Sequence, residues 1–164
     1  MLDGIHKIHL IGIGGSGMRA IANILIQKGY DVSGSDVAES AVISKFREMG
    51  ATVHIGHNKE YVNGVDAVVR STAIREDNPE IVAAKEQGIT ILHRSDIVKA
   101  VLDVTDGIAV AGAHGKTSTT SMIGQILVEA DADPTVIIGG EVDYLKGSSC
   151  LGKGHFSVEI GRAH

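Results

Sequence analysis

The chain has 164 residues, 43% of them hydrophobic, a composition typical of a folded protein and a length that suits one complete domain but is short for two. Its formal charge of −5 argues against a broad nucleic-acid interface, which needs clustered lysine and arginine. One cysteine excludes an internal disulfide, and neither a signal peptide nor a membrane-length apolar run is recognisable. We therefore expect a cytoplasmic protein that binds neither nucleic acid nor membrane.

Short apolar runs alternate with helical patterns from Lys7 to Asp103. The pattern predicts strands at 7–12, 31–36, 66–74 and 89–94, and a strand followed by a loop within 52–58. It predicts helices at 16–29, 40–50, 78–88 and 95–103, the last with Ser95 as N-cap. Strands separated by helices imply a parallel sheet that is covered on both faces. Residues 1–104 are therefore predicted to form a Rossmann-like, doubly wound α/β domain.

A second strand, glycine turn and helix follow at 106–130, and a further strand is predicted at 135–140. This segment has too few predicted strands to close a sheet. We therefore expect residues 105–158 to be the truncated start of a phosphate-loop ATPase-type α/β domain. The apolar residues of GIAVAG, MIGQIL and TVIIGG are then expected to lack partners and to be exposed.

The first glycine turn fits the pattern G-x-G-x-x-G at Gly12, Gly14 and Gly17, with a predicted strand before it and a helix after it. Bare glycines let the backbone approach a phosphate, and a helix N-terminus favours an anion. Asp36 ends the second strand, where a dinucleotide fold places its ribose-binding acid. The pattern leaves open a nicotinamide cofactor, a nucleotide sugar or a purely structural turn, and Asp36 could equally be a solvated strand end.

The second glycine turn reads AGAHGKTST and departs from the strict phosphate-loop pattern, because Val110 stands where that pattern has glycine. Lys116 can nevertheless reach the β- and γ-phosphates of a nucleotide, and the Thr117 hydroxyl can ligate Mg²⁺. The alternative is that Lys116 and Thr117 are ordinary residues at the start of a helix. Because a nicotinamide-binding domain needs no such loop, two phosphate turns in series indicate two ligands, one of them a nucleoside triphosphate.

Several short segments, in this order, resemble the Mur ligase family. They are GIGGSGM (12–18), SGSD (33–36), GH (56–57), STAI (71–74), DNPEI (77–81), HR (93–94), AGAHGKTSTTSM (111–122) and GGEV (139–142). The resemblance implies an ATP- and Mg²⁺-dependent ligase of peptidoglycan precursor synthesis, which joins L-alanine to the carboxylate of UDP-N-acetylmuramate through an acyl phosphate. The alternatives are the muropeptide-recycling ligase of the same family and a nucleotide-sugar or dinucleotide-binding module without catalysis.

The resemblance also implies roles for particular residues. It implies UDP-sugar contacts at Gly12, Gly14, Gly15, Ser16, Gly17, Met18, Asp36, His57, Ser71 and Arg94. It implies ATP contacts at Gly112, Ala113, His114, Gly115, Lys116, Thr117 and Ser118, with Lys116 catalytic and Thr117 a ligand of Mg²⁺. Without it, His57 reads as an ordinary loop histidine, Ser71 as a turn residue and Arg94 as half of a surface ion pair.

The last six residues, EIGRAH, depart from the family, which continues at this point with an acidic run whose first glutamate binds Mg²⁺. GAG-ATC-GGA-AGA-GCA-CAC encodes these residues, and AGATCGGAAGAGCACAC is a common sequencing adapter. We therefore expect residues 159–164 to be a non-native tail, so Glu159 is not assigned as a metal ligand. The alternative is a natural or engineered tail. We also expect the 164-residue chain by itself to lack ligase activity.

Overall fold

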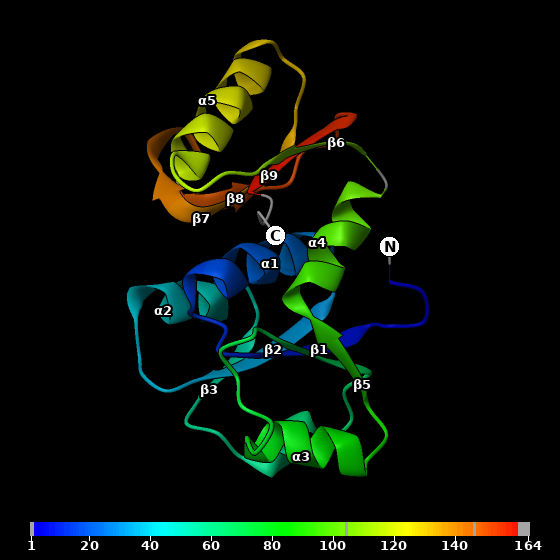
Figure 1. Cartoon of the computed structure of the whole chain (residues 1–164). Coiled ribbons are helices and arrows are strands. Elements are labelled where there is room, and N and C mark those ends of the chain that lie inside the picture. Colours follow the sequence, from blue (N-terminus) through cyan, green and yellow to red (C-terminus); the bar gives the residue numbers. More distant parts are fainter. Residues whose placement is uncertain (1, 104, 146, 161–164) are drawn as a thin grey trace. The chain divides into compact units, whose positions relative to one another are not determined.

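The protein is described here from a computed structural model that covers residues 2–103, 105–145 and 147–160. The chain separates into two compact units, Leu2–Ile97 and a second unit that begins at Val98 (Figure 1). Residues 161–164 of the predicted tail lie outside the described residues, whereas Glu159 and Ile160 belong to a strand. No helix in the described ranges is long and apolar enough to cross a membrane.

The first unit is built on a five-stranded sheet in the order β3-β2-β1-β4-β5, in which every neighbouring pair is parallel. Its strands are β1 (Lys7–Ile11), β2 (Asp31–Asp36), β3 (Thr52–Ile55), β4 (Ala67–Arg70) and β5 (Thr90–His93). The strand order reverses between β1 and β4, where the chain crosses from β3 through the short 3-10 helix η1 (Lys59–Val62). The predicted parallel α/β sheet is therefore confirmed.

Helices cover both faces of this sheet. Figure 1 shows α1 (Ser16–Gln27) and α2 (Ala41–Glu48) on one face and α3 (Pro79–Glu86) on the other, and α4 (Arg94–Leu102) follows β5. Two helix starts are determined by nearby residues. The side chain of Ser40 caps α2. The side chain of Asn78 caps α3, whose first residue is Pro79. This arrangement confirms the doubly wound fold class.

The core lies around β1, whose apolar side chains are buried on both faces of the sheet. Ile8, Leu10 and Ile11 are 0% exposed, as expected for the central strand of a covered parallel sheet. At Gly34, in the middle of β2, an added Cβ would lie 2.8 Å from Cδ1 of Ile13 and 2.9 Å from the carbonyl oxygen of Leu10. Only glycine fits there, so this residue lets the first glycine turn pack closely on the sheet.

One strand and one helix have different limits from those predicted. The strand predicted at 66–74 ends at Arg70, because Ser71 begins a turn in which its carbonyl accepts from the Ile74 N–H at 3.2 Å. Within 52–58, where a strand and then a loop are predicted, the strand ends at Ile55. The helix α4 begins at Arg94 rather than after a Ser95 cap, because the Asp96 carboxylate accepts from the His93 N–H at 2.7 Å.

The second unit contains a four-stranded sheet in the order β6-β9-β7-β8. Its elements are β6 (Asp106–Val110), α5 (Lys116–Glu129), β7 (Thr135–Val142), η2 (Asp143–Leu145), β8 (Gly147–Cys150) and β9 (Phe156–Ile160). The β8 strand was not predicted, nor was the insertion of β9 between β6 and β7, with which it pairs in parallel. The sheet is mixed, because β8 runs antiparallel to β7.

These strand pairings correct one expectation about exposed apolar residues. Val136 and Ile138 of β7 are 0% exposed, because β8 and β9 flank this strand and α5 packs against it. Met122 and Ile126 of α5 are 58% and 65% exposed, as expected for the MIGQIL segment. The predicted exposure is therefore wrong for β7 and confirmed for these two side chains of α5.

Candidate functional site

The residues predicted to hold a UDP-sugar all lie at the carboxyl ends of the parallel strands of the first unit. The glycine turn at 12–17 follows β1, Asp36 ends β2, His57 comes shortly after β3, Ser71 follows β4, and Arg94 follows β5. The carboxyl ends of parallel strands meet at one edge of the sheet. In open α/β sheets, ligands bind at this edge, where the strand order reverses.

The glycine turn is held by hydrogen bonds from its own backbone. Gly12 has a φ of +73°, which favours glycine. The Gly12 and Ile13 N–H groups both donate to the carbonyl of Ser35, at 2.8 and 3.1 Å. The Gly14 N–H donates to Oδ2 of Asp36 at 2.8 Å, and the Gly15 N–H donates to the Gly12 carbonyl. Asp36 therefore clamps the turn, a role that its position at a strand end did not predict.

The start of α1 leaves backbone N–H groups available to a ligand. Among the described residues, no acceptor faces the N–H groups of Ser16 and Gly17, and the Gly15 N-cap offers no side chain. The Arg94 side chain lies directly against Gly17, since an added Cβ there would be 3.2 Å from its Cδ and 3.3 Å from its Nε. Two free N–H groups, a helix dipole and a guanidinium thus converge where a diphosphate would fit.

Two other predicted residues of this site make local contacts. Met18 is 3% exposed, so its side chain belongs to the core and contributes by packing α1. Oγ of Ser71 accepts from the Ala73 N–H at 3.3 Å and stabilises the turn after β4. That turn supports the glycine turn, because Cδ1 of Ile74 would lie 3.5 Å from a Cβ at Gly12.

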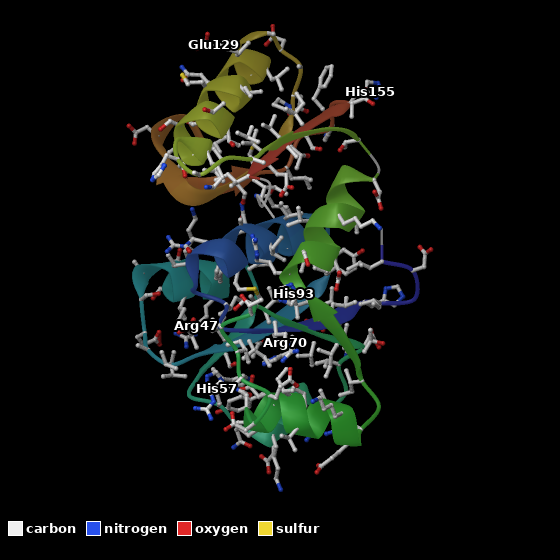
Figure 2. All side chains as sticks on the ribbon, in the orientation of Figure 1. Arg47, His57, Arg70, His93, Glu129 and His155 are labelled. Atoms are coloured by element: carbon white, nitrogen blue, oxygen red, sulfur yellow. The ribbon has the colours of Figure 1, made fainter. Side chains whose placement is uncertain are left out.

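A buried polar cluster centred on Glu80 lies next to this edge, and the sequence did not predict it. Glu80 is 0% exposed. Its Oε2 accepts from Oγ of Ser35 at 2.7 Å and lies 3.2 Å from Nε2 of His9. Its Oε1 lies 3.1 Å from Nδ1 of His57 and accepts from the Asn58 N–H at 3.2 Å. Of these residues, Figure 2 labels His57, the member that the sequence predicted as a ligand contact.

The sequence carried a partial signal for this cluster. His9, Ser33 and Ser35 lie in strands whose neighbours predict burial on both faces, and a buried polar side chain needs a polar partner. His9 accordingly bonds Ser33 through Nδ1 at 2.9 Å and Glu80 through Nε2. Glu80 itself looked like an ordinary acidic residue in the first turn of a helix, so the partner could not be identified from spacing.

We expect the Glu80 cluster to make the first unit sensitive to acid. Burial by itself raises the pKa of the Glu80 carboxyl, but hydrogen bonds from His9 and Ser35 outweigh burial and hold the pKa below its ordinary value of 4.5. The unfolded chain therefore takes up a proton at a higher pH than the folded chain. The stabilisation is present above about pH 4.5 and is lost as the pH falls through the lowered pKa.

We expect Glu80→Gln to unfold at a lower urea concentration than the wild type at neutral pH, and this difference to shrink below pH 4.5. The matched control is Glu86→Gln, which changes an exposed glutamate at the end of the same helix and should leave the urea midpoint nearly unchanged. A difference between wild type and Glu80→Gln that is constant from neutral to acid pH would contradict the assignment.

The second glycine turn joins β6 to α5 and ends in Gly115, whose φ of +76° favours glycine. Nζ of Lys116 donates to the carbonyls of Gly112 at 2.6 Å and Ala113 at 3.3 Å, so its ammonium lies over the loop. His114, Thr117 and Ser118 are exposed. The loop thus gathers the predicted ATP-binding residues around one helix N-terminus.

The start of α5 also leaves backbone N–H groups available to a ligand. In the described part of the chain, no acceptor faces the N–H groups at the start of α5, where the Gly115 cap has no side chain. The described residues contain no group of three His, Cys, Asp or Glu side chains that could hold a metal. A magnesium ion at this loop would therefore depend on Thr117 together with the oxygens of the bound phosphates.

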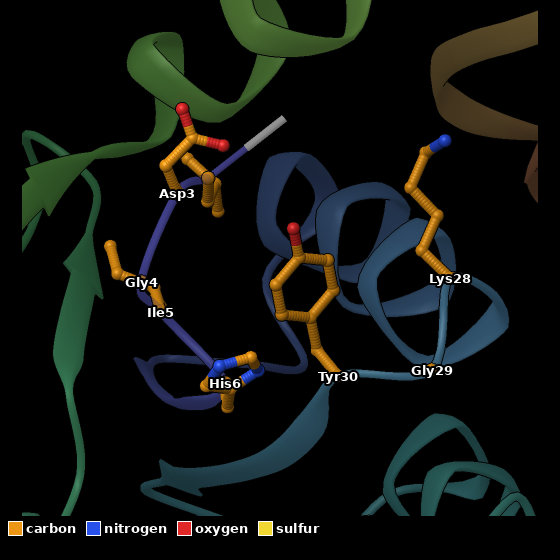
Figure 3. Close-up of a pocket in the computed structure, with 8 residues that line it drawn as sticks. Asp3, Gly4, Ile5, His6, Lys28, Gly29 and Tyr30 are labelled. Atoms are coloured by element: carbon orange, nitrogen blue, oxygen red, sulfur yellow. The ribbon is translucent and has the colours of Figure 1, made fainter.

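A cavity of about 440 Å³ lies at the opposite edge of the first sheet, among residues that precede β1 and β2 (Figure 3). It is lined by Leu2, Asp3, Gly4, Ile5, His6, Lys28, Gly29 and Tyr30. Because it lies at the amino ends of the strands, it is separate from the edge at which open α/β sheets bind their ligands.

Comparison with known proteins identifies one family. The sequence profile described as "Mur ligase family, catalytic domain" matches residues 7–104. A UDP-N-acetylmuramate–L-alanine ligase of Solidesulfovibrio magneticus is 46% identical over 158 residues, which are 96% of this chain and 35% of that protein. The chain thus spans about a third of the length of the curated relatives that it matches.

Two solved structures share the fold closely. A UDP-N-acetylmuramate-alanine ligase from Thermotoga maritima has a TM-score of 0.87 and 35% identity, over 93% of this chain and 36% of that chain. A UDP-N-acetylmuramate:L-alanyl-gamma-D-glutamyl-meso-diaminopimelate ligase from Neisseria meningitides has a TM-score of 0.88 and 26% identity, over 96% of this chain and 52% of that chain. The two folds match about equally well, so the fold alone does not distinguish between these two relatives.

Proposed function

The chain belongs to the Mur ligase family, and we propose that the whole protein joins L-alanine to the carboxylate of UDP-N-acetylmuramate at the expense of ATP. One observation carries the proposal: two helix N-termini, each with a different basic side chain beside it, lie in two separate units. The start of α1 is paired with Arg94, and the start of α5 carries Lys116. A protein that uses two phosphate-bearing substrates, here a nucleotide sugar and ATP, needs two such sites.

Residues 1–104 are proposed to form the UDP-N-acetylmuramate-binding domain. The N–H groups of Ser16 and Gly17, together with Arg94, would hold the diphosphate. His57, at the same edge of the sheet, would contact another part of the nucleotide sugar. Asp36 would act through the shape of the turn, because its carboxylate already accepts the Gly14 N–H.

Residues 105–158 are proposed to begin the central ATP-binding domain. In the proposed reaction, an oxygen of the muramyl carboxylate attacks the γ-phosphate, which gives an acyl phosphate and ADP. The amine of L-alanine then attacks the acyl carbon, forms the amide and releases phosphate. Lys116 would stabilise charge on the transferring phosphoryl group, and Thr117 would ligate Mg²⁺, which neutralises phosphate charge.

The second candidate is the muropeptide-recycling ligase of the same family. The fold allows it, since the Neisseria meningitides structure matches with a TM-score of 0.88. The lower identity of 26% to that structure, against 35% to the Thermotoga maritima enzyme, favours L-alanine as the amine substrate. A binding module without catalysis is disfavoured by the loop at 112–117, because such a module needs no lysine over a phosphate cradle.

Titration calorimetry of the 164-residue chain tests the first domain. We expect UDP-N-acetylmuramate and UDP to bind at the N–H groups and Arg94. NADH also carries a diphosphate, but we expect it to bind at least about tenfold more weakly, because the relatives that this chain matches are named for the UDP-sugar. The matched control is Gln27→Ala, at the far end of α1, which should bind UDP-N-acetylmuramate as the wild type does. Tighter binding of NADH than of the UDP-sugar would overturn the proposal.

A further inference from the structure

We propose that Glu80 is a positioning residue that fixes the proton of the His57 imidazole on Nδ1 and leaves Nε2 as a hydrogen-bond acceptor for the UDP-sugar. The inference rests on the proposed function of the first unit, and it adds a residue and a direction of hydrogen bonding to that site. It starts from the buried carboxylate, which contacts two imidazoles from different segments of the chain.

The contacts of Nδ1 determine where the proton lies. Oε1 of Glu80, at 3.1 Å, is a carboxylate oxygen and can only accept from Nδ1. Ser35 Oγ, at 3.2 Å from the same nitrogen, already donates its hydrogen to Oε2 of Glu80 at 2.7 Å. Ser35 can therefore also only accept from Nδ1. Both neighbours require an N–H at this position of the ring, which in the neutral imidazole leaves Nε2 with a lone pair.

The carboxylate that faces Nδ1 is itself rigidly placed. Glu80 is 0% exposed and lies in the first turn of α3, where its own N–H donates to Oδ1 of Asn78 at 2.9 Å. Its second oxygen is bound by Ser35 and His9 from neighbouring strands. Because the carbonyl of Ser35 also accepts from the Gly12 N–H, one residue connects the His57 contact to the glycine turn. This network fixes the position of the His57 imidazole relative to the glycine turn.

The orientation of the ring indicates which ligand group His57 recognises. Nδ1 faces the buried carboxylate, so Nε2 lies on the other side of the ring, and the side chain is 22% exposed. A neutral imidazole with a lone pair on Nε2 accepts a hydrogen bond and repels a phosphate oxygen. We therefore infer that His57 accepts a hydrogen bond from a hydroxyl or imide N–H of the nucleotide sugar. The diphosphate would be bound by the start of α1 and by Arg94.

The proton position is measured directly by long-range ¹H–¹⁵N correlation on the ¹⁵N-histidine-labelled 164-residue chain, at a pH at which His57 is neutral. We expect a protonated Nδ1 and an unprotonated Nε2 in the wild type. In Glu80→Met, which fills the space without an acceptor, this preference should disappear. In Glu80→Gln, whose amide oxygen can accept from Nδ1, it should return. A wild-type His57 with its proton on Nε2 would overturn the inference, whether or not any variant folds.

A double-mutant cycle on UDP-N-acetylmuramate affinity tests whether Glu80 acts through His57. Glu80→Met should weaken binding about tenfold, the equivalent of one lost hydrogen bond, whereas Glu80→Gln should retain most of the affinity. In a His57→Ala background, Glu80→Met should cause no further loss. Glu86→Met, on the exposed end of the same helix, is the matched control and should bind as the wild type does.

The outcomes separate this inference from the function on which it rests. If Glu80→Met weakens binding equally with and without His57, then Glu80 is merely structural, the inference fails and the proposed function stands. If the wild type binds no UDP-sugar although Nδ1 carries the proton, then the proposed function fails and so does the assignment of a nucleotide-sugar group to Nε2. The role of Glu80 in fixing the proton of His57 would survive that result.

Discussion

Replacing Lys116 by alanine in the whole enzyme is expected to reduce ATP-dependent turnover by about 100-fold or more, with little change in UDP-N-acetylmuramate affinity. Nζ of Lys116 lies 2.6 Å from the carbonyl of Gly112, so the ammonium is already held over the loop that would receive the phosphates. A charge placed in advance stabilises the transferring phosphoryl group without reorganisation during the reaction. The proposed UDP-sugar site belongs to the other unit, so the substitution should leave its contacts unchanged.

The measurement pairs phosphate release by the whole enzyme with calorimetry of the UDP-sugar. Lys116→Met separates charge from packing, because it keeps most of the side-chain length and should lose as much turnover as the alanine variant. Lys153→Ala removes an exposed lysine of the same unit and serves as the matched control. Turnover at the wild-type rate in Lys116→Ala would show that the loop is structural.

Gly17→Val is expected to weaken the binding of UDP-N-acetylmuramate by about 100-fold or more. Any side chain at this position would meet Arg94, whose Cδ, Nε and Nη1 lie within 3.3 Å of the added Cβ. The guanidinium would be displaced and the Gly17 N–H shielded from the diphosphate. A hydrogen bond to a charged group contributes about 1.5–3 kcal/mol, so losing two of them accounts for an effect of this size.

Arg94→Ala separates the two parts of this effect, because it removes the guanidinium and leaves the turn intact. We expect it to lose about tenfold in affinity, less than Gly17→Val. Thermal melts of both variants check that α1 remains folded. If Gly17→Val bound UDP-N-acetylmuramate with wild-type affinity, the glycine turn would not be part of the binding site.

The sequence by itself determined the alternation of strands and helices in the first unit and the position of both glycine turns. These features depend on local rules, namely apolar runs, amphipathic periodicity, helix caps and glycines at positive φ. Asn78 and Pro79 start α3, and Gly12 and Gly115 stand where only glycine adopts the backbone comfortably. Such signals lie within a few residues of the structure that they specify, so they can be recognised before any tertiary contact is known.

Only the tertiary structure decided which distant side chains meet. Strand order brings His9 to Glu80, 71 positions later in the chain, and brings Arg94 onto Gly17. It also places β9 between β6 and β7, which buries apolar residues that the sequence left without partners. The spacing of apolar and polar residues in the sequence indicates which strand or helix a residue belongs to. It does not indicate which residue lies beside it on the neighbouring strand. For that reason the family resemblance made His57 a candidate, whereas the carboxylate proposed to orient it could be recognised only in the fold.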